Sequence, residues 1–122
     1  MADIIAICDK ETVFVQILAE CLRKKFKKKL EIEAFDNADS LLAAAKEKTI
    51  VLCLLGEKMA DSFVLNELLS YTQNIIYFSA KKREDRIFKY QSAERVVADL
   101  LRICAEREII LFKESILFTR RH

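Results

Sequence analysis

Apolar and polar positions along the chain follow two alternating periods. Short apolar runs such as Ile4–Cys8 and Ile50–Leu55 are each followed by a stretch in which apolar residues recur every three or four positions. The first pattern predicts a strand and the second an amphipathic helix. Leu30–Phe35 instead alternates apolar and charged residues, which is typical of a strand with one face exposed to solvent. The predicted strands are 4–8, 30–35, 50–55, 75–79 and 86–90. Asp36-Asn37 can cap the helix after the second strand, and Ser92 caps the last helix.

Repeated strand–helix units predict an α/β fold with a parallel sheet and helices on both faces. Five strands in 122 residues favour a flavodoxin-like (CheY-like) three-layer sandwich with strand order 2-1-3-4-5. Only Ala80–Asp85 and their flanks separate the fourth and fifth predicted strands, which is too short for a helical crossover. We therefore expect the fourth helix to be missing or very short.

Composition, with 52% hydrophobic and 33% charged residues, is typical of a single globular domain. We expect a domain over residues 1–106 and a β-prone C-terminal extension over 107–122. The beginning Met-Ala-Asp lacks the features of a signal peptide, and no apolar run is long enough to span a membrane. Four cysteines without a C-x-x-C pair are typical of reduced core residues. These features together predict a cytoplasmic protein.

Gly56 is the only glycine in a chain without proline, and it follows the most apolar predicted strand. In the 2-1-3-4-5 order, functional residues gather at the carboxyl ends of strands 1 and 3, so Gly56 falls at that edge. One interpretation is a turn that needs a positive φ angle.

Four stretches carry a resemblance to response-regulator receiver domains. "AICDKETVFVQIL" resembles the first strand and helix of a receiver, and "LLGEKMADSF" resembles its phosphorylation-site loop. "IIYFSA" resembles the fourth strand, and "IFKYQSAERVVADLLRI" the fifth strand and last helix. The last stretch is also similar to the atypical receivers at the N-terminus of MinD-type ATPases that localise Tad/Flp pilus machinery, the TadZ and CpaE group. The resemblance implies a role in two-component signalling or in pilus-machinery localisation.

The resemblance also implies a vestigial phosphorylation pocket. Active receivers use an acceptor aspartate after strand 3, two acidic residues after strand 1 that help to hold Mg²⁺, a Ser or Thr after strand 4 and a Lys after strand 5. Gly56 falls at the acceptor position, or Glu57 does if the alignment contains a gap of one residue. The matching pocket residues are Asp9, Lys10, Gly56, Glu57, Ser79 and Lys89.

This pattern predicts a degenerate metal site, because Lys10 stands beside Asp9 where a second carboxylate is common. We expect no catalytic residue, no cofactor and no small-molecule substrate, so the chain is not predicted to be an enzyme. Asp9 has the simpler interpretation of a helix-capping or strand-end carboxylate paired to lysine, and Lys89 that of a cation that pairs with Asp9 or a nearby glutamate. A working phosphoacceptor that uses Glu57 is the alternative function.

The run Arg23–Lys29 holds six cations in seven positions. Cations at the end of a helix interact favourably with its dipole, which is the simpler interpretation. The alternative is a surface that binds nucleic acid or an anionic membrane.

The C-terminal segment 107–122 lies beyond the receiver resemblance. Its runs Ile109–Phe112 and Ser115–Thr119 are β-prone, and exposed apolar strands of this kind pair with a partner or with their own sheet. We therefore expect a protein partner, with a homodimer as the first hypothesis and folding back over the domain as the competing one. The predicted contact residues are Ile109, Ile110, Leu111, Phe112, Ile116, Leu117 and Phe118.

Overall fold

A computed structural model describes residues 3–27 and 29–111 of the chain. Five parallel strands form one sheet in the order β2-β1-β3-β4-β5, which confirms the predicted flavodoxin-like arrangement. The strands are β1 (Asp3–Cys8), β2 (Glu31–Phe35), β3 (Thr49–Gly56), β4 (Ile75–Ser79) and β5 (Ile87–Phe88). The helices are α1 (Thr12–Phe26), α2 (Ala38–Glu47), α3 (Ser62–Leu69) and α4 (Ala93–Glu106), with a short 3-10 helix η1 (Glu57–Met59) after β3.

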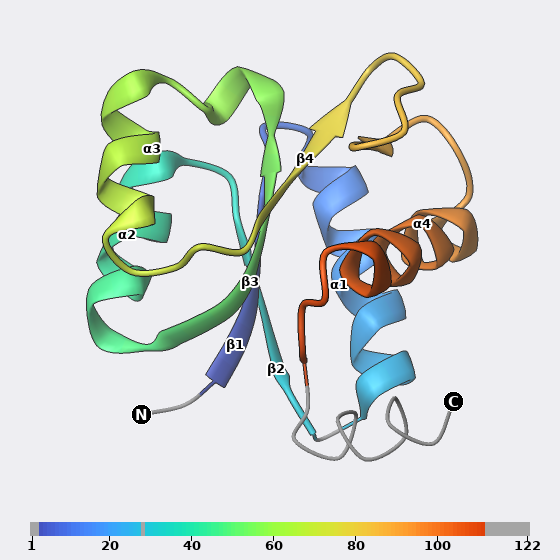
Figure 1. Ribbon diagram of the computed structural model, residues 1–122, viewed down its shortest axis with the longest axis horizontal. Coiled ribbons are helices and arrows are strands. Elements are labelled where there is room, and N and C mark those ends of the chain that lie inside the picture. The colour runs from blue at the N-terminus through green and yellow to red at the C-terminus, as the bar shows by residue number, and fades with distance from the viewer. Residues whose placement is uncertain (1–2, 28, 112–122) are drawn as a thin grey trace.

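Helices cover both faces of the sheet: α1 and α4 lie on one side and α2 and α3 on the other (Figure 1). Successive side chains of β1 enter the two cores in turn, so Ile5 and Ile7 face α1 and α4 while Ile4 and Cys8 face the other layer. Burial on both faces explains why Ile4–Cys8 of β1 and Ile50–Leu55 of β3 are continuously apolar.

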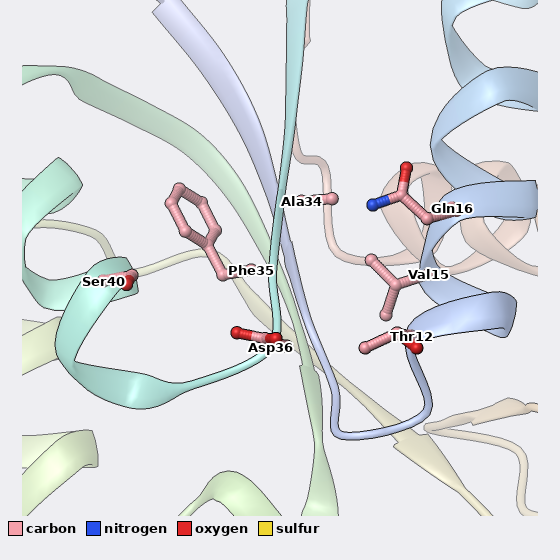
Figure 2. A pocket seen from close by; sticks show the side chains of 7 residues that line it. All are labelled: Thr12, Val15, Gln16, Ala34, Phe35, Asp36 and Ser40. Carbon is pink, nitrogen blue, oxygen red and sulfur yellow. The ribbon is translucent and has the colours of Figure 1, made fainter.

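β2 is an edge strand whose alternation is visible in its last two residues. Ala34 points toward α1 and Phe35 points away toward α2 (Figure 2). Asn37 caps the next helix, α2, and its side chain accepts the Ser40 backbone N–H at 2.8 Å. Ser92 caps α4 in the same way, so both predicted caps are confirmed.

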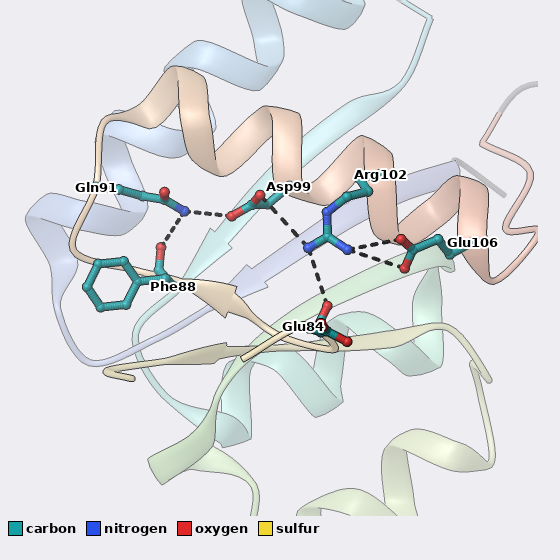
Figure 3. Close-up of polar contacts among 6 residues, drawn as sticks. All are labelled: Glu84, Phe88, Gln91, Asp99, Arg102 and Glu106. Atoms are coloured by element: carbon teal, nitrogen blue, oxygen red, sulfur yellow. Dashed lines mark hydrogen bonds and ion pairs between the residues drawn. The ribbon is translucent and has the colours of Figure 1, made fainter. Parts of the chain in front are cut away.

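The connection between β4 and β5 contains no helix, as its length predicts. Side chains from α4 and the preceding loop hold this connection in place (Figure 3). Arg102 donates to the Glu84 carbonyl at 3.3 Å, and Gln91 donates to the Phe88 carbonyl at 2.8 Å. These donors satisfy backbone groups that a covering helix would otherwise protect. β5 is shorter than the predicted 86–90 because only two of its residues pair with β4.

The chain after α4 turns back over the helix. Glu108 has φ 58°, and the N–H of Ile109 donates to the carbonyl of Cys104 at 2.8 Å, as in a Schellman turn. Ile109 and Leu111 then pack against the α1–α4 core. The predicted β segment is therefore wrong for residues 109–111, because the turn directs them onto the core; its remainder, residues 112–122, lies outside the described residues.

All four cysteines are free thiols. Burial raises the pKa of Cys8 to about 12 and that of Cys104 to about 11, so both are protonated at neutral pH. Within the described ranges, no helix combines the length and hydropathy needed to cross a membrane.

Candidate functional site

The carboxyl edge of the sheet gathers residues that follow different strands. Asp9 comes after β1, Gly56 ends β3, Ser79 ends β4 and Lys89 follows β5, so the parallel topology places all four at the same edge of the sheet. A pocket of about 200 Å³ opens at this edge. It is lined by Asp9, Lys10, Glu11, Glu57, Lys58, Met59, Phe78, Ala80, Lys89 and Tyr90.

A buried ion pair closes the floor of this pocket. The Lys89 ammonium lies 2.9 Å from each carboxylate oxygen of Asp9, and the two side chains are only 10% and 6% exposed. Lys89 also contacts Glu11 at 3.2 Å. Burial by itself would lower the pKa of Lys89, but the hydrogen bonds to Asp9 and Glu11 outweigh it and raise the pKa above the ordinary value. Lys89 is therefore charged at neutral pH.

Gly56 is explained by the position of the Asp9 carboxylate. Its φ angle is −61°, which any residue adopts, so the positive-φ interpretation is wrong. A Cβ atom at residue 56 would lie 2.4 Å from Oδ2 of Asp9 and 3.0 Å from its Cγ. Only a residue without a side chain lets Asp9 cross the end of β3 and reach Lys89. The carboxylate of Asp9 thus fills the space where a side chain at position 56 would begin.

Glu57 is engaged by a residue that the sequence did not indicate. Arg86 forms an ion pair with its carboxylate, and the Arg86 guanidinium lies 4.8 Å from the centre of the Tyr77 ring. Arg86 belongs to the short β4–β5 connection, and its position depends on the pairing of Ile87 with Phe78. That register is set by tertiary structure, so no local sequence signal marked Arg86 as the partner of Glu57.

A second missed contact ties the start of α1 to the chain after β5. The Tyr90 hydroxyl donates to a Glu11 carboxylate oxygen at 2.8 Å. This bond, together with the bond from Lys89, lowers the pKa of Glu11. The same bond raises the pKa of Tyr90, because ionised Tyr90 would lose its donor proton beside a carboxylate.

The two remaining predicted residues lie apart from the central ion pair. Lys10 is exposed at the rim and forms no ion pair with any residue in the described ranges, so Asp9 is paired with Lys89 rather than with its neighbour. Ser79 is buried, and its hydroxyl accepts the backbone N–H of Lys81 at 3.1 Å. Ser79 therefore shapes the turn after β4 and does not line the pocket.

The pocket does not fit the Mg²⁺ that active receivers hold. Both oxygens of Asp9 are already bound to the Lys89 ammonium, which brings a positive charge to the place where a metal would be held. Among the residues that the structure describes, no three His, Cys, Asp or Glu side chains form a metal-binding group. Mg²⁺ needs several oxygen ligands in an octahedral array. The three carboxylates that line the pocket do not supply them, because Asp9 and Glu11 are paired with Lys89 and Glu57 is paired with Arg86.

A second hollow, of about 220 Å³, lies between α1, the end of β2 and α2 (Figure 2). It is lined by Thr12, Val15, Gln16, Ala34, Phe35, Asp36 and Ser40. Its lining includes one carboxylate and no cation, so it lacks the convergent charged groups of the pocket at the carboxyl edge.

No protein-family model and no curated protein matches the chain. Among solved structures, the chain is similar to the solution structure of the beryllofluoride-activated NtrC receiver domain. The two share 15% sequence identity with a TM-score of 0.49, over 83% of this chain and 76% of that one. The class of the protein is defined by its own strand order and helical layers, which are those of a flavodoxin-like α/β sandwich.

Proposed function

We propose that the chain is a receiver-like module without phosphotransfer chemistry, which acts by binding protein partners. The observation that carries this proposal is the Asp9 carboxylate, which fills the space beside Gly56 and is held there by Lys89. This arrangement offers no acceptor at position 56 and occupies the cavity that an acceptor would need. The chain would then respond to partners rather than to phosphorylation.

The contacts of Glu57 argue against the alternative of an unconventional phosphoacceptor. Its carboxylate is paired with Arg86, whose guanidinium is stacked on Tyr77. A phosphoacceptor has to be an available nucleophile beside a bound metal, and a guanidinium-paired carboxylate in a pocket that does not fit Mg²⁺ meets neither condition.

Phosphorylation can be tested directly with acetyl phosphate and Mg²⁺. We expect the intact mass of the chain to stay unchanged, because Gly56 has no side chain and the single carboxylate of Asp9 is neutralised. A stoichiometric gain of one phosphoryl group would overturn the proposal. Repeating the measurement on Glu57→Gln would then show whether Glu57 is the acceptor.

A variant that adds carboxylates to the pocket tests the alignment of its residues with those of active receivers. Gly56→Asp restores an acceptor but forces it against Asp9, and Lys10→Asp adds the second acidic residue. The double variant should bind Mg²⁺ more tightly than the parent, because carboxylate number governs affinity at such a site. A thermal-shift titration with MgCl₂ measures this affinity, and Lys81→Asp is the matched control outside the pocket. Equal Mg²⁺ responses in parent and double variant would contradict the alignment.

The partner we propose first is a second copy of the chain, with the C-terminal segment in the contact. Ile110 supports this assignment because its side chain is 52% exposed, whereas its neighbours Ile109 and Leu111 pack on the core. A truncation after Leu111 is therefore a sharper test than one after Glu106, because it keeps the residues that pack on α4 and removes the rest of the segment.

Light scattering on the full chain and on the truncated chain distinguishes the two hypotheses for this segment. A dimer that becomes a folded monomer on truncation would support the proposed contact. A monomeric full chain would contradict it and favour a segment that folds back over its own domain.

The resemblance to the TadZ and CpaE group supports a finer proposal, that the module belongs to the localisation machinery of a pilus. In that case the parent gene should encode a Gly-rich Walker A loop downstream of this chain. A parent gene without such a loop would contradict this finer assignment and leave the broader one unaffected.

A further inference from the structure

The end of α1 carries an exposed group of cations that the candidate pocket does not use. We call Arg23, Lys24, Lys25, Lys27 and Lys29 the α1 cation cluster; all five residues are exposed. Arg23 has structural contacts, since it donates to the Ile32 carbonyl at 2.9 Å and lies 3.7 Å from Glu20. By contrast, no carboxylate of the described residues pairs with Lys24, Lys25 or Lys27.

Helix stability does not require so many cations. A favourable interaction with the helix dipole is confined to the last turn, which already holds Arg23, Lys24 and Lys25, and the run continues past the end of the helix with Lys27 and Lys29. Additional lysines at spacings of three and four residues repel each other. Lys27 also adopts φ 52° and ψ −127°, a conformation suited to glycine rather than to a side chain. Backbone strain of this kind at a charged residue suggests a role outside folding.

Charge is distributed unevenly between this segment and the rest of the chain. Residues 20–31 contain six cations and two carboxylates, a net charge of +4. Removing these from the total of 21 cations and 19 acids leaves 15 and 17, so the remainder of the chain has a net charge of −2. A molecule with this charge distribution turns its positively charged end toward an anionic surface.

We propose that the α1 cation cluster docks the protein on an anionic membrane surface. Clusters of four to eight Lys or Arg residues on an amphipathic helix are typical of binding to anionic lipid headgroups. Nucleic acid is less well suited, because the only aromatic residue in the run, Phe26, is buried and cannot stack on bases. The cations also lie together at the C-terminal end of α1 and are not arranged along a groove.

The cluster lies at the opposite edge of the sheet from the candidate pocket (Figure 1). α1 has 15 residues, so its two ends are about 22 Å apart. Docking through the cluster therefore leaves the pocket edge and the β4–β5 connection turned away from the membrane, where they can contact proteins. The inference rests on charge and exposure and is independent of the proposed loss of phosphotransfer.

Vesicle co-sedimentation of the full chain tests the proposal. We expect binding to vesicles of phosphatidylcholine and phosphatidylserine in a ratio of about two to one, and none to phosphatidylcholine alone. Binding should disappear at about 0.5 M salt, where surface charges are screened. The triple variant Lys24→Gln, Lys25→Gln, Lys27→Gln should bind about 100-fold more weakly, since each charge contributes about fivefold.

The matched control is Lys81→Gln, Lys82→Gln, Arg83→Gln, which removes the same charge from exposed residues of the β4–β5 connection. It should bind the anionic vesicles like the parent, and circular dichroism verifies that both triple variants are folded. Equal loss of binding in the two variants would overturn the proposal, because net charge rather than this surface would be responsible. Absence of binding to anionic vesicles, or tighter binding to a DNA duplex at the same salt concentration, would also overturn it.

Discussion

Lysines near the two ends of α1 are in opposite surroundings. Lys89, beside the start of the helix, is 10% exposed and holds both oxygens of Asp9. Lys24 and Lys25, at the end of the helix, are exposed and pair with no carboxylate among residues 3–27 and 29–111. The comparison shows that a cation can fix the fold where it is enclosed and remain available to a partner where water surrounds it.

The physical reason for this difference is desolvation. A buried charge that loses its partner is left without either water or a counter-charge, so an enclosed pair is costly to break. An exposed cation remains hydrated whether or not it has a partner, and its removal changes stability little. Variants at the two ends of α1 should therefore differ sharply in their effect on folding.

The largest effect is expected for Lys89→Met, which leaves the Asp9 carboxylate buried without a counter-charge. We expect the free energy of unfolding to fall by about 3 to 5 kcal/mol. Denaturation in urea measures the change. Glu11→Gln is the control, because it removes only the exposed partner of Lys89 and should cost less than about 1 kcal/mol. Equal losses of unfolding free energy in the two variants would mean that the buried Asp9–Lys89 pair contributes no more to stability than the exposed contact of Lys89 with Glu11.

The pH dependence of stability gives a second measure of the same pair. Because the pKa of Lys89 is raised in the folded state, its contribution is complete below the ordinary lysine value of about 10.4 and is lost as pH rises through the folded value. The stability difference between the parent and Lys89→Met should therefore narrow above about pH 10.4. A difference that stays constant there would contradict the assigned ion pair.

An intermediate effect is expected for Gly56→Ala. The new methyl group would collide with the Asp9 carboxylate, which Lys89 and the backbone N–H of Glu11 hold in place. We expect a loss of about 2 kcal/mol in the free energy of unfolding. In an Asp9→Ala background the collision is absent, so the same substitution should cost at least about 1 kcal/mol less. If the losses of unfolding free energy caused by Gly56→Ala and Asp9→Ala were strictly additive, the close approach of the Asp9 carboxylate to residue 56 would be contradicted.

The smallest effect, and one of opposite sign, is expected for Lys27→Gly. Glycine adopts the backbone conformation of residue 27 without strain, so stability should rise by about 0.5 to 1 kcal/mol. Lys24→Gly, inside the same helix, should instead lower it by about 1 kcal/mol. If both variants lower stability equally, Lys27 is not strained and the argument from its conformation fails.

Much of the fold could be predicted from local patterns. The period of apolar residues located every strand, and Asn37 and Ser92 marked two helix beginnings, because these signals are contained within a few consecutive residues. The short β4–β5 connection also predicted the missing helix. The β segment predicted from Ile109 failed in its described part, because β-prone residues there are drawn onto the core by the turn at Glu108.

The candidate pocket was predicted only in part. The carboxyl edge and the resemblance located Asp9, Gly56, Glu57 and Lys89. The expected pairing of Lys89 with Asp9 or a nearby glutamate is confirmed by its contacts with Asp9 and Glu11. Arg86 and Tyr90 were not predicted because they lie just before and just after β5, and their positions depend on the register of β5 with β4.

The sequence by itself determined the order of elements, the edge of the sheet at which charged residues gather, and the excess of cations at the end of α1. Tertiary structure alone decided that Asp9 crosses Gly56 to reach Lys89, and that Glu57 is paired with Arg86. Local patterns specify elements because propensity and burial period act between neighbours in the chain. Glu57 and Arg86 are 29 positions apart in the chain, and Asp9 and Lys89 are 80 positions apart. Both ion pairs depend on how the strands are registered, which no local sequence pattern specifies.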